Sequence, residues 1–297
     1  MKPNISPKSV NEKVHWAELL PDELGRRMDD FPLVYLPLGL CEPHGEICAY
    51  GLDTIKAEWL CVEAARRDGG VVAPTLGYQI HESGYHARWL EDEVGQNNPR
   101  MTGMPPEVLL KFFLYQLRAF FNAGFRGVIA VSGHSGGNQQ DLRRVTEAFT
   151  RRVPGIVVRA LSDPELVMGV HAADHAGRYE VSQLLYLRPD LVDFRKADRA
   201  TDGNLALRAD AREATLDRGE KIMNDCLASL RRIAGEVRRT LPTASATKVD
   251  YELCEQIWAG LVSQSHKIPW TTARPWPGQT PVTQGSQWKP YEEGFPT

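Results

Sequence analysis

The sequence predicts an α/β fold in which a mostly parallel sheet is flanked by helices on both faces, a three-layer α/β/α arrangement. Apolar runs of strand length alternate with helical patterns along residues 32–187. The run at 127–132 (GVIAVS) is almost continuously apolar, as expected for a strand covered on both faces. The chain has 297 residues, of which 42% are hydrophobic and 25% charged, so it can bury a large core without disulfides or metals.

The first part of the pattern predicts two strands, one helix and a long loop. We expect a strand over 32–40 (PLVYLPLGL), a helix over 54–67 with its apolar residues on one side, and a strand over 71–76. The stretch 77–103 has no clear periodicity and is expected to be a loop. Loops of this length inside compact domains are usually functional or disordered.

The next helix is marked at both ends. Prolines at 105 and 106 suit its first turn, and Gly124 is a natural C-terminal stop. Strands are expected over 127–132 and 155–161. Further helices are expected over 139–151, over 175–187 and over most of 206–240.

We expect residues 1–260 to form a single domain and residues 261–297 to form an extended tail. The last thirty residues contain six prolines and three tryptophans. Such a segment is more typical of an extended strap than of a catalytic element. We expect it to pack on the domain or on a neighbouring subunit.

The composition excludes several classes of protein. The net charge is −3, with no basic excess to neutralise a phosphate backbone, so nucleic acid is not an expected partner. Residues 1–13 lack the apolar stretch of a signal peptide, and charges interrupt the apolar run at 108–121, so no membrane association is expected. The five cysteines form no C-x-x-C pair, which indicates reduced thiols in a cytoplasmic protein.

Potential metal ligands follow three of the predicted strands. Glu42-Pro43-His44-Gly45 follows the first strand, and Asp53 comes nine residues after His44. In open α/β sheets, ligands bind beyond the carboxyl ends of the strands. Divalent metals take imidazole nitrogens and carboxylate oxygens, and a pair of metals needs a shared anion such as a short aspartate. The other two clusters are GHSGGN at 133–138 and DHAGRYE at 174–180.

Each cluster alone has an ordinary interpretation. A Glu-x-His pair is about as common on a surface loop as in a site, and His134 alone is more often a hydrogen-bonded loop residue. A glycine-rich turn before a helix is often only a turn or a phosphate cradle, although GHSGGN lacks the lysine of a P-loop. Cys41 and Cys48 flank the first cluster, but harder ligands lie between them. The coincidence of three clusters at strand ends of one sheet favours a metal site.

These three motifs, in this order, resemble those of the creatininase (creatinine amidohydrolase) family. The first motif stands as LPLGLCEPHGEICAYGLD, the second as VSGHSGGNQQ, and the third as HAGRYEVSQLLYLRPDLVD. The segment ATLDRGEKIMNDCL is similar to a late helix of the family. The resemblance extends over about residues 32–240.

The resemblance implies a homo-oligomer, with a hexamer as one arrangement, that holds two divalent metals (Zn, Mn or Fe) per subunit. By this resemblance, Glu42 and His134 would hold one metal and His44 would hold part of the other. Asp53 would bridge the two. In creatininase a glutamate two residues after the second motif's histidine completes the second metal site, but Gly136 stands there in this chain.

We expect Glu180 to replace that missing ligand and His175 to shuttle a proton. The expected reaction is attack on an amide carbonyl by a hydroxide between the two metals, with His175 protonating the leaving nitrogen. This predicts a metal-dependent amidohydrolase that cleaves a C–N bond of a small or cyclic amide, such as a lactam or formamide. A peptidase and a non-catalytic binding protein that keeps the fold are the alternatives.

Creatinine itself is not the expected substrate, because Ser135 and Gly136 replace the residues that follow the histidine in creatininases. The 77–103 loop also departs from the family and is expected to shape the pocket or to form an oligomer contact. The expected substrate-binding residues are Ser135, Gly136, His81 and His86.

Overall fold

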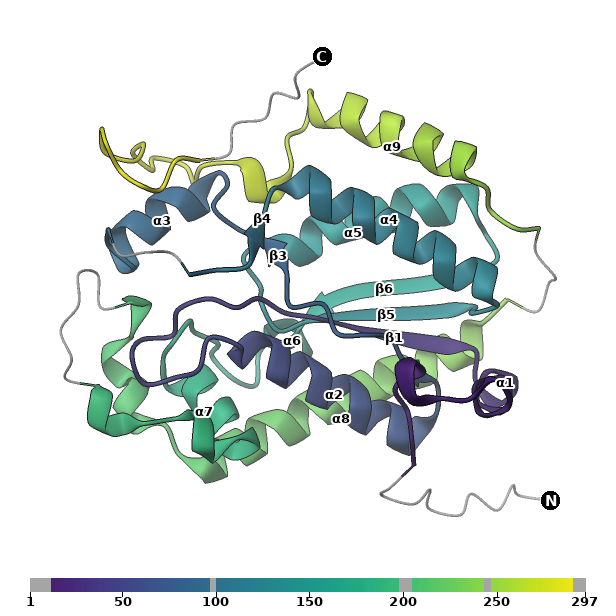
Figure 1. The fold of residues 1–297 in the computed structure, drawn as a ribbon, viewed down its shortest axis with the longest axis horizontal. Coiled ribbons are helices and arrows are strands. Elements are labelled where there is room, and N and C mark those ends of the chain that lie inside the picture. The colour runs from purple at the N-terminus through teal and green to yellow at the C-terminus, as the bar shows by residue number, and fades with distance from the viewer. Residues whose placement is uncertain (1–11, 97–99, 198–204, 243–246, 291–297) are drawn as a thin grey trace.

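Four parallel strands form the central sheet of the computed structural model, which describes residues 12–96, 100–197, 205–242 and 247–290. Their order is β2-β1-β5-β6, and strands β3 and β4 pair in a separate small sheet (Figure 1). Strands β1, β5 and β6 begin side by side, since Leu33 pairs with Gly127 and Gly127 with Val157. The strands are β1 (Leu33–Leu38), β2 (Val71–Val72), β3 (Gln79–Ile80), β4 (Gly103–Met104), β5 (Gly127–Ser132) and β6 (Val157–Ser162).

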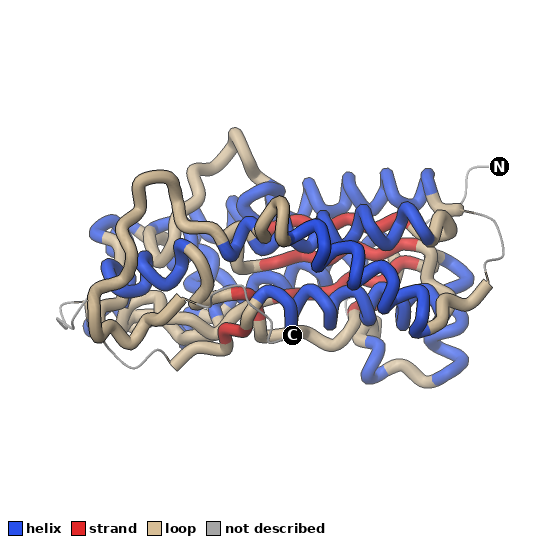
Figure 2. Tube along the Cα trace, turned by 90° about the horizontal axis from the view of Figure 1, so that it is seen from above, coloured by secondary structure: helices blue, strands red, loops and turns tan. Residues whose placement is uncertain are grey.

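Helices cover both faces of this sheet, which confirms the predicted three-layer architecture (Figures 1 and 2). Val34 and Leu36 of β1 pack in one buried cluster with α4, α5 and α9, whereas Leu33 and Tyr35 pack in a second cluster with α2 and α8. Alternate residues of one strand therefore enter two different cores, and this is why its sequence is apolar throughout. The helices are α1 (Pro21–Asp30), α2 (Leu52–Asp68), α3 (Tyr85–Glu93), α4 (Pro106–Ala123), α5 (Asn138–Arg152), α6 (Asp163–Leu166), α7 (Arg178–Leu187), α8 (Leu216–Thr240) and α9 (Tyr251–Ser265).

Three predicted elements differ from those observed. The stretch 77–103 is not a plain loop, because it contains β3, α3 and β4. The helix expected from 206 begins at Leu216, where the Thr215 hydroxyl accepts a hydrogen bond from the Arg218 amide and caps it. The strand expected over 71–76 ends at Val72.

The C-terminal segment lies on the domain, beside α3 and α5 (Figure 1). Helix α9 passes through residue 260, the expected boundary between domain and tail. Beyond it, the buried Asp141 of α5 accepts hydrogen bonds from the amides of Thr271 and Thr272 and from the Thr272 hydroxyl, at 2.8–2.9 Å. The indole nitrogen of Trp288 donates to the carbonyl of Gly95. Residues 291–297 of the expected tail lie outside the described residues.

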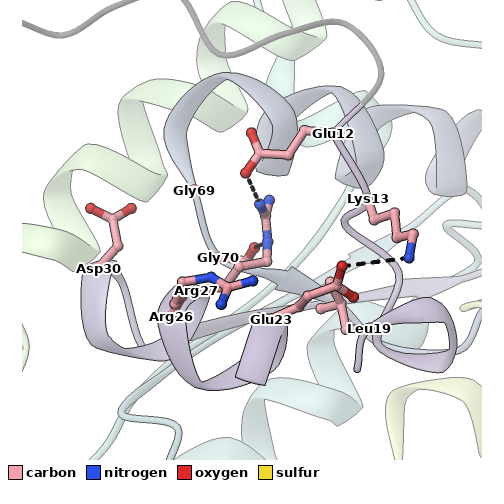
Figure 3. Close-up of a pocket in the computed structure, with 9 residues that line it drawn as sticks. All are labelled: Glu12, Lys13, Leu19, Glu23, Arg26, Arg27, Asp30, Gly69 and Gly70. Atoms are coloured by element: carbon pink, nitrogen blue, oxygen red, sulfur yellow. Dashed lines mark hydrogen bonds and ion pairs between the residues drawn. The ribbon is translucent and has the colours of Figure 1, made fainter. Parts of the chain in front are cut away.

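A charged cavity of about 460 Å³ lies at the amino ends of the strands (Figure 3). Arg27 of α1 crosses it and donates to the carbonyls of Gly70 and Ala65, at 3.0 and 3.2 Å, and pairs with Glu12. Because this guanidinium already has three partners, we assign it a structural role: it holds α1 against the end of α2. None of the helices in the described ranges is long and apolar enough to cross a membrane.

Candidate metal centre

The five proposed metal ligands come together at the carboxyl ends of the parallel strands. Glu42 and His44 follow β1, and His134 follows β5. Asp53 lies in the first turn of α2, and Glu180 in the first turn of α7. All five side chains are buried. This is the edge of an open α/β sheet at which ligands are expected to bind.

A close backbone contact at Gly133 brings β5 and α2 together. A Cβ atom at this position would lie 2.0 Å from the carbonyl oxygen of Asp53. Only glycine allows the end of β5 to approach the first turn of α2 so closely. The contact places His134 beside Asp53, with Nδ1 3.6 Å from Oδ2.

The ligand atoms fall into two groups that share Asp53. Site 1 consists of Glu42, Asp53 and His134, and site 2 consists of His44, Asp53 and Glu180; within each, the potential ligand atoms lie within 4.8 Å of one another. In site 1, His134 Nδ1 is 2.8 Å from Glu42 Oε1. In site 2, His44 Nε2 is 3.3 Å from Glu180 Oε2 and 3.7 Å from Asp53 Oδ1. One oxygen of Asp53 thus faces each site.

The hydrogen bonding of these side chains fits metal binding. His44 Nδ1 lies 3.0 Å from the carbonyl oxygen of Glu42, which fixes the ring and leaves Nε2 for a ligand. That Nε2 and both carboxylate oxygens of Asp53 are buried and have no hydrogen-bond partner among the described residues. Buried polar atoms are normally satisfied. A mixed set of carboxylates and imidazoles suits Zn²⁺, Mn²⁺ or Fe²⁺.

Lys56 and Asp163 also belong to this centre, although neither lies in one of the three motifs. The Lys56 ammonium is buried and lies 2.6 Å from Glu180 Oε1, 3.4 Å from Asp53 Oδ1 and 3.4 Å from Asp163 Oδ1. Lys56 stands one helical turn after Asp53, next to the apolar face of α2. A lysine on the buried side of a predicted helix is the signal that could have found it.

Opposite charges set the protonation of the histidines. Burial would lower the pKa of His44, but the neighbouring Glu180 carboxylate, 3.3 Å from Nε2, raises this pKa to about 9. Burial would likewise lower the pKa of His134, whereas Glu42 and Asp53 raise this pKa to about 10. Burial opposes ionisation of Glu42, yet the charges of His134 and His175 hold its pKa well below the usual value.

His175 lies at the rim of the centre, with a quarter of its side chain exposed. Its Nε2 is 3.2 Å from the carbonyl oxygen of Pro43, so Nε2–H is held as a donor. The opposite nitrogen, Nδ1, is 3.9 Å from Glu42 Oε1 and 3.8 Å from Glu180 Oε2. The ring stacks on His44, with 4.7 Å between centroids. Nδ1 is therefore the ring nitrogen that faces the two carboxylates.

His81 and His86 come from the segment around α3 and have different surroundings. His81 Nδ1 accepts a hydrogen bond from the Glu82 amide at 3.0 Å, which places the proton on Nε2, 3.3 Å from Glu42 Oε2. The contacts of His81 therefore fit the role of a hydrogen-bond donor that orients Glu42, and fit the role of a metal ligand less well. Both nitrogens of His86 are buried without a hydrogen-bond partner in the described structure. A Cβ atom on Gly136 would lie 2.5 Å from His86 Nε2.

A cavity of about 160 Å³ opens over the two sites. Ser135, Gly136, His81 and His86 all line it, as does His175. Its aromatic wall includes Trp276 from the C-terminal segment, which stacks on Tyr85 with 4.4 Å between ring centroids. The sequence does not predict Trp276 at the site, because nothing in the local pattern indicates which part of the domain the tail contacts. The other lining residues are Glu42, Trp89, His134, Asp174 and Glu180.

Cys41 and Cys48 take no part in a potential metal site within the described ranges. Two further groups of ligand atoms accompany sites 1 and 2. One contains Glu42, His44 and His175, and the other contains only histidines, namely His81, His86 and His134. The tautomer of His81 argues against the all-histidine group.

Comparisons with known proteins identify the family of this chain. The family profile described as creatininase, creatinine amidohydrolase, matches residues 17–234. A creatinine amidohydrolase of Pseudomonas putida is 23% identical over 243 residues, which are 71% of this chain and 90% of that protein. A 3-dehydro-scyllo-inosose hydrolase of Thermotoga maritima is 24% identical over 147 residues, 49% of this chain and 43% of that protein.

Solved structures show the same fold. The chain superposes on a crystal structure of creatinine amidohydrolase with a TM-score of 0.64 and 22% identity, covering 78% of this chain and 100% of the other. Creatininase structures described as a Mn form and as a mutant of Zn-Zn type match with TM-scores of 0.62 and 0.63, at 23% identity and with 78% of this chain covered. The matches cover 100% and 99% of those two chains, respectively. The profile match, which spans most of the chain, shows that this protein belongs to the creatininase family.

Proposed function

We propose that this protein is a metal-dependent amidohydrolase that uses two divalent metals to cleave a C–N bond of a small or cyclic amide. The observation that carries the proposal is the pair of three-residue groups sharing Asp53, in which His44 Nε2 and both Asp53 oxygens are buried and make no hydrogen bond within the described residues. Relatives known in Zn and Mn forms support the choice of metals. Bound metals would lower the pKa of water towards about 7 and polarise the carbonyl of the amide.

The protein's own side chains position the reactants. Glu42, His134 and one oxygen of Asp53 would hold the first metal, and His44, Glu180 and the other oxygen the second. His81 donates to the second oxygen of Glu42 and so fixes the direction of this carboxylate. Asp53 and Glu180 lie in the first turns of helices, and all five side chains are buried, so we expect the geometry to be set before substrate binds.

His175 is the proposed proton donor to the leaving nitrogen. Its Nε2–H is held by the Pro43 carbonyl, and its Nδ1 lies beside Glu42 and Glu180 at the cavity. A proton taken up at Nδ1 can therefore be passed to a group bound in the cavity. General acid catalysis of this kind contributes typically about 10²–10⁴-fold to a rate.

The cavity favours a small substrate. Its volume of about 160 Å³ is below the roughly 300–1,000 Å³ of sites for drug-sized ligands, which favours a small amide over a peptide. Neither lysine nor arginine is among its described lining residues. The Trp276 and Tyr85 rings suit a flat or cationic group.

The metal content of the protein and the activity of two variants test the proposal. Protein purified without chelator should contain close to two metals per subunit, and chelation should abolish hydrolysis until Zn²⁺ or Mn²⁺ is restored. Asp53→Ala should lose bound metal, whereas His175→Ala should keep the metal and lose turnover. Normal turnover by metal-free protein would exclude this mechanism.

A substrate screen should start from creatinine, small lactams, formamides and hydantoin-like rings. The relative from Thermotoga maritima adds 3-dehydro-scyllo-inosose to the panel. Release of a C-terminal dipeptide from a test peptide would indicate the peptidase alternative. Protein without any metal as purified and after Zn²⁺ addition would indicate a binding protein that retains the fold.

Assembly and location are proposed from the same family membership. We propose that the protein forms a homo-oligomer, with a hexamer as the specific expectation, and that it resides in the cytoplasm. Light scattering of the purified protein measures the subunit number directly. Fractionation of the source cells tests the location.

A further inference from the structure

The C-terminal segment supplies an aromatic side chain to the cavity over the candidate metal centre. This segment follows α9 and lies beyond residue 234, where the match to the family ends. Trp276 lines the cavity, and its indole stacks on Tyr85 with 4.4 Å between ring centroids and 15° between ring planes. Trp276 is still 52% exposed. An indole that Tyr85 supports and that keeps free surface can stack on a further flat group.

A tight turn fixes the position of this indole. The sequence Trp276-Pro277-Gly278-Gln279 fits a type II turn, which favours proline at its second position and needs a positive φ at its third. Gly278 has a φ of +79°, and the Gln279 amide donates to the Trp276 carbonyl at 2.9 Å. The Gln279 side chain accepts from the Trp276 amide and donates to the Tyr85 carbonyl, both at 3.1 Å. The turn is therefore tied to the ring on which the indole stacks.

The segment also packs closely on two stretches of chain that border the cavity. A Cβ atom on Gly84, directly before α3, would lie 2.4 Å from the carbonyl carbon of Ala273. A Cβ atom on Gly137, in the second motif, would lie 3.2 Å from the Thr271 side chain. Glycine at both positions lets the segment approach the loop that carries His134 and the segment that carries α3. The indole therefore has a set place relative to the proposed metal ligands.

We propose that Trp276 is a specificity-determining residue, whose indole selects amides that carry a flat, conjugated ring. A flat ring gains stacking energy beyond the burial of its area, whereas a puckered ring of the same size gains only the burial. Trp276 has no titratable group, so this role concerns substrate choice and not proton transfer. The inference rests on the proposed function, because it assumes that the amide binds in the cavity over the metal centre.

Two ring amides of similar size serve as probes: hydantoin, which is flat and conjugated, and 2-piperidinone, which is puckered. Ligand-observed NMR titration of the Zn²⁺-loaded full-length protein measures their binding and also shows ring opening; for a probe that is hydrolysed, kcat/KM replaces the affinity. Trp276→Ala should lower the affinity for hydantoin by about 3- to 10-fold and that for 2-piperidinone less. Trp276→Phe should keep most of the preference for hydantoin, and Trp276→Leu, which keeps only bulk, should lose it.

Tyr251→Ala is the matched control. Tyr251 is an aromatic residue at the start of α9, is 63% exposed and is not among the described residues that line the cavity. Its removal should leave both affinities unchanged. An equal loss of both probes in Trp276→Ala would show that the indole only fills space, and this would overturn the inference. A wild type that does not prefer hydantoin would overturn it too.

Gln279→Leu keeps the inference testable if Trp276→Ala does not fold. This change leaves the indole in place but removes the side chain that ties its turn to Tyr85, so the preference for hydantoin should fall; an unchanged preference would count against the fixed indole. The Zn²⁺ content of every variant should equal that of the wild type. A wild type that binds Zn²⁺ and hydrolyses an amide independently of Trp276 would overturn this inference alone. Absence of both Zn²⁺ binding and hydrolysis would overturn the proposed function.

Discussion

His44 and His134 hold protons that the folded protein stabilises when no metal is bound. Their pKa values are raised to about 9 and about 10, mainly by Glu180 and Glu42 respectively, against the opposing effect of burial. In the unfolded chain both values return to about 6.5. The protonated forms thus stabilise the metal-free fold fully below pH 6.5, and this contribution is lost as the pH rises through 9 and 10.

We therefore expect the free energy of unfolding of chelated protein to fall between pH 7 and pH 10. Urea unfolding at several pH values in the presence of chelator measures this. The free energy of unfolding of His134→Asn should fall less steeply over this range, because only one of the two histidines with a raised pKa remains. A free energy that is constant or rises over this range would contradict the assignment.

Gly136 is a residue at which even a methyl group should matter. A Cβ atom would lie 2.5 Å from His86 Nε2 and 2.8 Å from His134 Nε2, and the backbone φ of +38° is unfavourable for other residues. We expect Gly136→Ala to lower the free energy of unfolding by about 1–3 kcal/mol. At Gly260 on α9, a Cβ atom would meet no other atom within 4 Å, so Gly260→Ala should instead stabilise by up to about 1 kcal/mol. Thermal unfolding of the two variants measures both changes in stability. Equal effects of Gly136→Ala and Gly260→Ala would contradict the prediction.

The residues of the centre differ in how far the sequence could predict them. Glu42, His44 and His134 follow strands whose carboxyl ends meet, so their proximity could be predicted from the alternation of elements. Lys56 could not be placed in the same way, because burial of an ammonium depends on carboxylates from several elements. Asp163 follows the last strand of the sheet, but no motif marks it.

At the scale of elements, the C-terminal segment is fastened at one buried side chain. Asp141 accepts three hydrogen bonds from Thr271 and Thr272. We expect Asp141→Ala to lower the free energy of unfolding by about 2–3 kcal/mol, because charged hydrogen bonds are lost and two amides lose their partner. The segment after α9 should also become more sensitive to limited proteolysis. Asp190, an exposed residue paired with Arg188, is the control, and Asp190→Ala should change stability by less than about 1 kcal/mol.

Helix α3 shows why the sequence predicts only a loop over residues 77–103. It is short, and its buried residues rest on other parts of the chain: the Tyr85 amide donates to the Arg274 carbonyl, and the Tyr85 carbonyl accepts from Gln279. A sequence window around α3 contains neither partner. By contrast, α2, α4 and α5 carry their own apolar faces, so the sequence predicts them nearly to their ends.

At the scale of the whole molecule, we expect the fold to be independent of the candidate metal centre. Two large apolar clusters on opposite faces of the sheet contain none of the proposed ligands. We therefore expect chelated protein to keep its far-ultraviolet circular dichroism while its melting temperature falls. For a site at 100 times its dissociation constant, bound metal contributes about 2.7 kcal/mol. Loss of secondary structure on chelation would contradict this independence.

The position of Trp276 has a consequence for the order in which the molecule is completed. The ribosome releases the sheet, its covering helices and every proposed ligand before it releases Trp276, the lining residue of the cavity that comes from the C-terminal segment. A nascent chain at that stage can already gather its carboxylates and imidazoles around a cation while its reaction chamber still lacks one side. We therefore expect the ligand set to be complete in the chain before Trp276 closes one side of the cavity.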